Sequence, residues 1–205
     1  MTPPHILIRE LAPSLVDDYV RFFEEVAFKD FPWWSACYCR FFNDPSDPQG
    51  NSGPEMREHH RALAIDLVRS GQTQGLLAYV DGRPVGWCNA APRASFRMPR
   101  HVARAIDDPN EPVGSTVCFL VGADYRGQGV ALAMLDAACE KFHAQGLRIA
   151  EGYPKTTPPP TAPWPVPSAQ HEYHGPMAMF LSAGFRVHRE LDGFAVVRKA
   201  LAPTS

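Results

Sequence analysis

The sequence contains one stretch whose residue types and spacing suit the binding of phosphate. An apolar run at residues 117–121 is followed by a loop with Arg126, Gly127 and Gly129, and a helical pattern begins directly after it. Backbone N–H groups at a helix start have no partner inside the helix, and the helix dipole adds partial positive charge there. Glycine holds no Cβ against a ligand, and arginine adds a charged fork suited to a diphosphate. The stretch therefore predicts a phosphate-binding loop, with a plain strand-to-helix turn as the alternative.

The loop differs from two common nucleotide-binding motifs. It is not G-x-x-x-x-G-K-[ST], the P-loop of nucleoside triphosphatases. It also lacks the G-x-G-x-x-G spacing, followed by an acidic residue about 20 positions later, that marks dinucleotide-binding proteins. The pattern therefore favours neither of these two ligand classes.

A third family does match the loop. The spacing R-x-x-G-x-A, formed by Arg126, Gly129 and Ala131, resembles the acyl-CoA pyrophosphate loop of the GNAT superfamily of N-acetyltransferases. A second segment, MFLSAGF at residues 179–185, is similar to a characteristic segment near the C-terminus of these enzymes. The resemblance implies acetyl-CoA as co-substrate, with its pantetheine arm paired to a strand edge like an added strand. The residues implied in this binding are Phe119, Leu120, Val121, Arg126, Gly127, Gln128, Gly129, Val130 and Ala131.

The predicted elements follow the GNAT order along nearly the whole chain. Periodicity and turn signals predict strands over residues 6–10, 74–80, 84–90, 115–121, 148–153, 185–190 and 194–199. Helices are expected after a cap at Ser14, from Pro54 to Gly71, over residues 131–146 and from Pro176 to Gly184. The resemblance implies the GNAT fold, an α/β (α+β) architecture with a mixed, mostly antiparallel sheet of about seven strands and helices on both faces. Its fourth and fifth strands are parallel and splay apart to admit the thioester arm.

Composition predicts one globular domain over residues 1–205. The net charge is −2 and the pI about 6.4, so nothing favours binding to nucleic acid or to an anionic membrane. No apolar run reaches the ~20 residues that span a bilayer, and the first residues lack signal-peptide features. The odd number of cysteines, five, does not predict a disulfide framework. We expect a cytoplasmic protein, compatible with a homodimer, in which the proline-rich residues 154–168 form a surface loop.

The implied reaction is direct attack of a primary amine on acetyl-CoA in a ternary complex. The amine must lose a proton, the oxyanion of the thioester must be stabilised, and the thiolate must depart. Holding the two reactants in attack geometry supplies much of the rate. A backbone N–H near residues 119–121 is the expected oxyanion donor. A small-molecule acceptor is favoured over a protein or peptide amine.

The general acid and base are the least defined part of this prediction. GNAT enzymes often carry a tyrosine as general acid at the position that Phe180 occupies here, and phenylalanine has no hydroxyl. Tyr173 and His174, predicted to open the same helix, are the nearest substitutes. Glu151 on the fifth strand and Glu172 are the candidate bases. The alternatives are that His171, Glu172 and His174 are solvated residues around a helix N-terminus and that Glu151 is a surface residue.

An aromatic segment before the second helix is the expected acceptor site. Trp33, Trp34 and Tyr38 could form an apolar or cation-binding wall there, with Asn89 as a polar group on the acceptor side. The alternatives are that the aromatics pack on the core and that Asn89 is a turn residue at a strand end. Cys118 could act as a nucleophile, although a buried apolar role is favoured.

Two other functional classes remain open. Loss of the usual tyrosine at Phe180 is compatible with a non-catalytic acyl-CoA-binding sensor or interaction module. The pair Cys37 and Cys39 would suit a redox- or metal-responsive regulator, but zinc sites usually use C-x-x-C with two further ligands, and no second pair is visible. We therefore expect no metal and favour the transferase.

Overall fold

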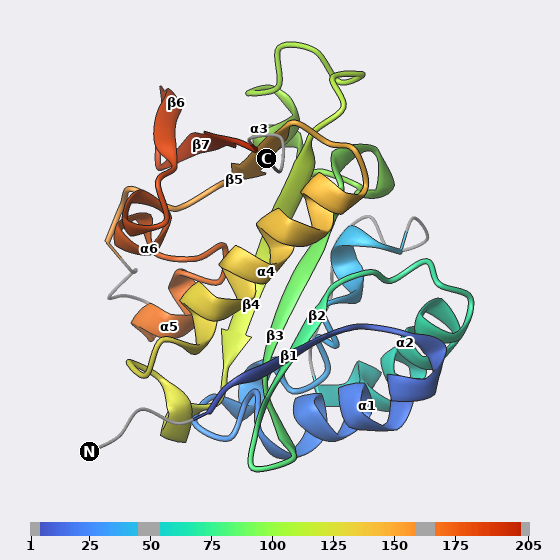
Figure 1. The fold of residues 1–205 in the computed structure, drawn as a ribbon. Coiled ribbons are helices and arrows are strands. Elements are labelled where there is room, and N and C mark those ends of the chain that lie inside the picture. Colours follow the sequence, from blue (N-terminus) through green and yellow to red (C-terminus); the bar gives the residue numbers. More distant parts are fainter. Residues whose placement is uncertain (1–4, 45–53, 159–166, 202–205) are drawn as a thin grey trace.

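A seven-stranded sheet with helices on both faces organises the protein (Figure 1). The computed structural model describes residues 5–44, 54–158 and 167–201. The strand order is β1-β2-β3-β4-β5-β7-β6. The strands are β1 (Leu7–Glu10), β2 (Leu76–Val80), β3 (Arg83–Pro92), β4 (Gly114–Val121), β5 (Ile149–Gly152), β6 (Arg186–Leu191) and β7 (Phe194–Ala200). Only β4 and β5 pair in parallel among these described strands, which confirms the expected mixed, mostly antiparallel sheet.

Two hydrophobic layers hold the helices against the sheet. α1 (Val16–Glu25) and α2 (Arg57–Arg69) cover one face, where Phe22 and Phe23 of α1 are fully buried. α4 (Val130–Ala144) covers the opposite face and buries Met134 and Phe142. Each such side chain stabilises the fold by about 1.5–3 kcal/mol. The short helices are α3 (Arg100–Ala103), α5 (Ser168–His171) and α6 (Met177–Ser182).

Two local predictions are wrong. Ser14 makes no capping hydrogen bond, because a short 3-10 helix at Pro13–Leu15 precedes α1 and takes over its first turn. Tyr173 and His174 do not open a helix but lie in the turn between α5 and α6. The helix cannot include them because Gly175 has a φ of 92° and precedes Pro176, which disfavours helical backbone.

The proline-rich segment is described only in part. Its first residues continue from β5, and Lys155 forms an isolated antiparallel bridge with Phe194. The rest of the predicted surface loop, residues 159–166, lies outside the described residues. Within the described ranges, no helix is both long and apolar enough to cross a membrane.

The parallel strands β4 and β5 separate after a short pairing. Gly114, Ser115 and Thr116 of β4 pair with Ala150, Glu151 and Gly152 of β5, and β5 then ends. β4 continues for five more residues to Val121, still paired with β3 on its other side. The second half of β4 therefore has no strand neighbour toward β5, as the splayed arrangement expected from the sequence requires.

Candidate active site

The turn between α5 and α6 reaches into the gap beside β4. The Phe119 N–H donates to the Tyr173 carbonyl at 2.6 Å, and Nδ1 of His174 lies 2.7 Å from the Val117 carbonyl oxygen. Because a carbonyl only accepts, the His174 Nδ1 carries the hydrogen in this contact. The turn therefore pairs with the edge of β4 at the point where β5 has departed.

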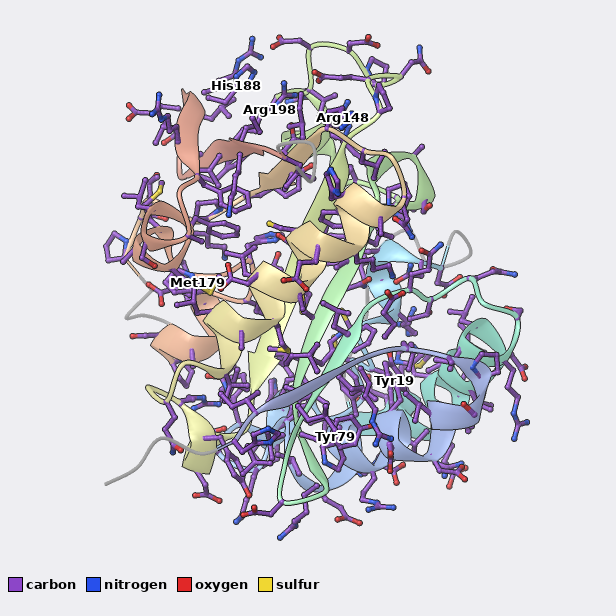
Figure 2. The ribbon with its side chains drawn as sticks, in the orientation of Figure 1. Tyr19, Tyr79, Arg148, Met179, His188 and Arg198 are labelled. Carbon is purple, nitrogen blue, oxygen red and sulfur yellow. The ribbon has the colours of Figure 1, made fainter. Side chains whose placement is uncertain are left out.

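A cavity of about 430 Å³ opens between this turn, the end of β4 and the start of α4. Figure 1 shows that α5 and α6 lie on the same side of α4. β4 contributes Phe119, Leu120 and Val121, and the following loop and helix contribute Arg126, Gly127, Gly129, Val130 and Ala131. The opposite wall is formed by Ala169, Gln170, Glu172, Pro176 and Met179, the last of which Figure 2 labels on α6. Of the nine residues predicted to bind the cofactor, eight line this one cavity.

The glycine loop at the end of the cavity has the geometry of an open anion site. Gly127 and Gly129 have φ values of 72° and 84°, and a Cβ on either would meet no atom within 4 Å. These glycines are therefore required by the left-handed backbone and not by crowding. The first N–H to bond along α4 is that of Ala133, which donates to the Gly129 carbonyl at 2.9 Å. The preceding N–H groups, from Val130 onward, have no carbonyl within the helix to bond.

Two loop side chains make contacts that the sequence did not predict. The Arg126 guanidinium donates to both carboxylate oxygens of Asp30, at 2.5 and 3.1 Å, and its Nε donates to the Val121 carbonyl. The hydrogen bond from Arg126 lowers the pKa of Asp30. Gln128 does not line the cavity, and its side-chain amide donates to the Asp124 carbonyl at 2.8 Å. Arg126 is thus held by an acidic residue distant in sequence, and the positive charge that would face a diphosphate is partly balanced.

Phe180 occupies the interior next to the gap. Its ring is fully buried and lies 6.0 Å from the ring of Phe119. A Cβ on Gly152 would lie 2.4 Å from this ring, and one on Gly175 would lie 2.9 Å from it. The absence of a side chain on both glycines is what admits the phenylalanine. Phe180 fills space under the gap and offers no group that could transfer a proton.

The residues proposed as acid and base lie on two sides of the turn. Glu172 is exposed and lines the 430 Å³ cavity. The rings of Tyr173 and His174 are 4.1 Å apart and face the α1 and α2 side, where Trp34 packs on Tyr173 and Phe42 on His174. Burial raises the pKa of Tyr173, which keeps its hydroxyl protonated. The turn therefore presents one carboxylate to one face of the sheet and an imidazole to the other.

Glu151 lies apart from these residues in a buried ionic network. Its carboxylate accepts hydrogen bonds from Arg93 at 3.0 Å, from Arg198 at 2.7 Å and from the Tyr153 hydroxyl at 2.6 Å. Arg198 also pairs with Glu111, so the network joins β5, β7 and the segment before β4. Both oxygens of Glu151 are occupied, and its side chain is 1% exposed. This environment suits a structural anion more than a general base.

The expected acceptor residues differ in exposure and in their partners. Trp33 is exposed, whereas Trp34 packs between Phe31 and Tyr173. Tyr38 is buried, and its hydroxyl donates to Glu24. Asn89 is not a turn residue at a strand end but a fully buried member of β3, and its amide donates to Asn43 at 2.9 Å.

The cysteines are free thiols, and four of the five are buried. Within the described residues, no group of three or more His, Cys, Asp and Glu side chains is arranged to hold a metal ion. The Asn89 amide donates to the Cys39 sulfur at 3.3 Å. A hydrogen bond to Cys39, together with burial, raises the pKa of Cys118 well above its usual range. Cys118 is therefore protonated, as a buried apolar residue and not as an activated nucleophile.

Known proteins share this architecture. The family model "Acetyltransferase (GNAT) family" matches residues 13–152. The N-acetyltransferase PaiA from Thermoplasma acidophilum, in complex with coenzyme A, superposes with a TM-score of 0.54 at 13% identity, covering 96% of this chain and 99% of its own. A GNAT acetyltransferase from Streptococcus pneumoniae gives 0.50 at 17%, covering 97% and 100%. An N-acetyltransferase from Staphylococcus aureus Mu50 gives 0.53 at 11%, covering 97% and 99%.

No curated protein matches the sequence. The family match nevertheless covers more than half of the chain, and it includes β4, the glycine loop and α4. The structural neighbours show the same fold over almost their whole length. The strand order, the splayed parallel pair and the glycine loop at the start of α4 are consistent with both findings. The chain is a member of the GNAT family of acetyltransferases.

Proposed function

We propose that the protein transfers the acetyl group of acetyl-CoA to a primary amine on a small molecule, by direct attack in a ternary complex. One observation carries the proposal: a single 430 Å³ cavity runs from the edge of β4 that β5 has left to the open N–H groups at the start of α4. A strand edge suits the amide groups of pantetheine, and a helix start suits a pyrophosphate. The coenzyme A complex of the structural neighbour PaiA agrees with this choice of co-substrate.

The backbone of β4 supplies the polar groups beside the thioester. Phe119 directs its N–H toward the gap, and the alternation of a strand turns the Val121 N–H to the same side. Once the Tyr173 carbonyl releases the Phe119 N–H, these two donors are spaced to pair with an extended pantetheine arm. An N–H of this edge would also stabilise the oxyanion that forms when the amine attacks.

His174 is the proposed proton carrier. Its Nδ1 hydrogen is fixed on the Val117 carbonyl, which makes Nε2 the basic nitrogen of the ring. In the proposed step the amine nitrogen bonds to the carbonyl carbon, the carbon–sulfur bond breaks, and the amine proton moves to His174. The CoA thiolate leaves without a protein acid, because Phe180 has none to offer. The Tyr173 ring, in tilted contact with the imidazole, orients it, and Glu172 lines the cavity on the thioester side.

Two readouts test this proposal. Acetyl-CoA should raise the melting temperature, since a ligand that binds only the native state stabilises it. Incubation with acetyl-CoA and a pool of small primary amines should yield acetylated products by mass spectrometry; five free cysteines make thiol reagents unsuitable. The absence of any shift with acetyl-CoA or CoA would refute the cofactor assignment.

A second function has a specific observation in its favour. The Phe119 N–H is bonded to the Tyr173 carbonyl, and Phe180 replaces the usual tyrosine. Both features fit a module that binds acyl-CoA without catalysing transfer. A melting-temperature shift with acetyl-CoA, combined with no acetylated product from amine and peptide pools, would favour this sensor over the enzyme.

A further inference from the structure

A second, smaller cavity lies on the other side of the turn between α5 and α6. Its volume is about 180 Å³, below the roughly 300–1,000 Å³ typical of sites for drug-sized ligands. It is lined by Val102, Tyr153, Lys155, His174, Asp192 and Phe194. These residues come from α3, the exit of β5, the turn, and the β6–β7 hairpin. His174 therefore belongs to this cavity while its Nδ1 is bonded to the β4 edge.

Lys155 is the cation of this cavity. Its backbone is held by the bridge to Phe194, and its ammonium lies 5.2 Å from the centre of the Tyr173 ring. Burial lowers the pKa of the half-buried ammonium. Among the described residues, no carboxylate forms an ion pair with Lys155, although Asp192 lines the same cavity. A partly desolvated cation without a counter-ion is a receptor for an anion.

We infer that this cavity holds the acceptor and that Lys155 binds the carboxylate of an amino acid whose amine points at His174. The inference rests on the proposed function. Within one cavity, Lys155 offers an anion receptor and His174 the proposed proton carrier, and the volume of the cavity suits a small molecule. A carboxylate is favoured over a phosphate because a single lysine next to Asp192 faces the ligand, whereas phosphate sites commonly use several donors. An amine without an anionic group would leave Lys155 unpaired.

The test compares amino acids with their amides. Two probe pools, free L-amino acids and the corresponding L-amino acid amides, are presented to the CoA-bound protein in saturation-transfer NMR. We expect binding from members of the acid pool and not from their amides. Lys155→Gln should abolish this binding, and Lys155→Arg should restore most of it. In turnover, Lys155→Gln should raise KM for the preferred acid at least tenfold while kcat changes less than twofold.

Lys199→Gln is the matched control. Lys199 also stands over an aromatic ring, 6.0 Å from the centre of Phe185, but it lines neither cavity. Both variants lose a cation–ring contact, so only a loss of acid binding confined to Lys155→Gln supports the inference. Equal binding of acids and amides, unchanged binding in Lys155→Gln, or no binding of any acid would overturn it. Failure of the proposed function would give a different result. Acetyl-CoA would then not shift the melting temperature of any variant, whether or not amino acids bind.

Discussion

The two cavities flanking the turn between α5 and α6 are built from different groups. The larger one relies on backbone: the edge of β4, two left-handed glycines and the first N–H groups of α4. The smaller one relies on side chains from four separated segments, with Lys155 and His174 as its charged and titratable groups. A backbone site tolerates many side chains as long as the glycines remain. A side-chain site depends on each member, so it can set specificity for one acceptor.

The largest expected effect concerns the ionic network beneath the smaller cavity. Glu151→Ala removes the partner of buried Arg93 and of the Tyr153 hydroxyl, and Tyr153 lines that cavity. Removing one partner of a buried ion pair costs about 3–5 kcal/mol, because the remaining charge is unpaired. Chemical denaturation should show a loss of this size, whereas Glu190→Ala on the exposed surface of β6 should cost little. A loss below about 1 kcal/mol would mean that Glu151 is not a structural anion.

Removal of the His174 imidazole should impair turnover without impairing acetyl-CoA binding in the larger cavity. We expect His174→Ala to lower kcat about a hundredfold, the low end of general acid–base effects, while acetyl-CoA raises the melting temperature at least as much as in the wild type. The exposed His188, labelled in Figure 2, lines neither cavity, and its alanine variant serves as the control. An unchanged kcat in folded His174→Ala would remove this residue from the chemistry.

Substitution of Gly129 should weaken acetyl-CoA binding in the larger cavity. Gly129→Val forces a β-branched residue to adopt a φ of 84°, and relaxation of the loop would move the N–H groups away from the pyrophosphate. We expect the affinity for acetyl-CoA, measured by calorimetry, to fall at least tenfold, about 1.4 kcal/mol. Gly82→Val at the β2–β3 turn has nearly the same strain, with a φ of 75° and equal space for a Cβ. Equal affinity losses in both variants would indicate general destabilisation and not a phosphate loop.

The smallest effect is expected from the acidic residue that holds Arg126. Asp30→Asn frees the guanidinium and removes a negative charge near the loop, so acetyl-CoA should bind a few-fold more tightly, with a steeper salt dependence. Titration calorimetry at two ionic strengths measures this change. A lower affinity would show that Asp30 instead positions Arg126 for the ligand.

The same pair gives a small pH effect with a defined sign. Arg126 lowers the pKa of Asp30 in the folded protein relative to the value of about 3.9 expected for this carboxyl in the unfolded chain. The resulting stabilisation is present above that unfolded value and disappears as the pH falls through the lower folded pKa. The pair is about one third exposed, so the change in unfolding free energy between wild type and Asp30→Asn should be modest. A larger difference at low pH than at neutral pH would contradict this sign.

The contrast between the cavities also explains what the sequence could predict. The glycine loop is local, because one short motif contains the strand end, the left-handed residues and the helix start; eight of its nine predicted residues line one cavity. The fold could be predicted for the same reason, because periodicity and turn signals are local; one such signal is the pair Asp81-Gly82, whose residues both have positive φ between β2 and β3. Lys155 and Asp192 are 37 positions apart in the sequence. They line the same cavity because the backbone of Lys155 pairs with Phe194 at the start of β7. Nothing in their local sequence marks them, and the ion pair of Arg126 with Asp30 was missed for the same reason.

The hydrogen bond between the Phe119 N–H and the Tyr173 carbonyl affects how readily acetyl-CoA can bind at the edge of β4. A backbone N–H serves one strong acceptor at a time, so a pantetheine amide can take this donor only when the turn gives it up. Cofactor binding and the hydrogen bond between the turn and β4 are therefore thermodynamically linked, and each weakens the other by the same factor. Anything that loosens the turn would therefore make the protein a better receptor for acetyl-CoA.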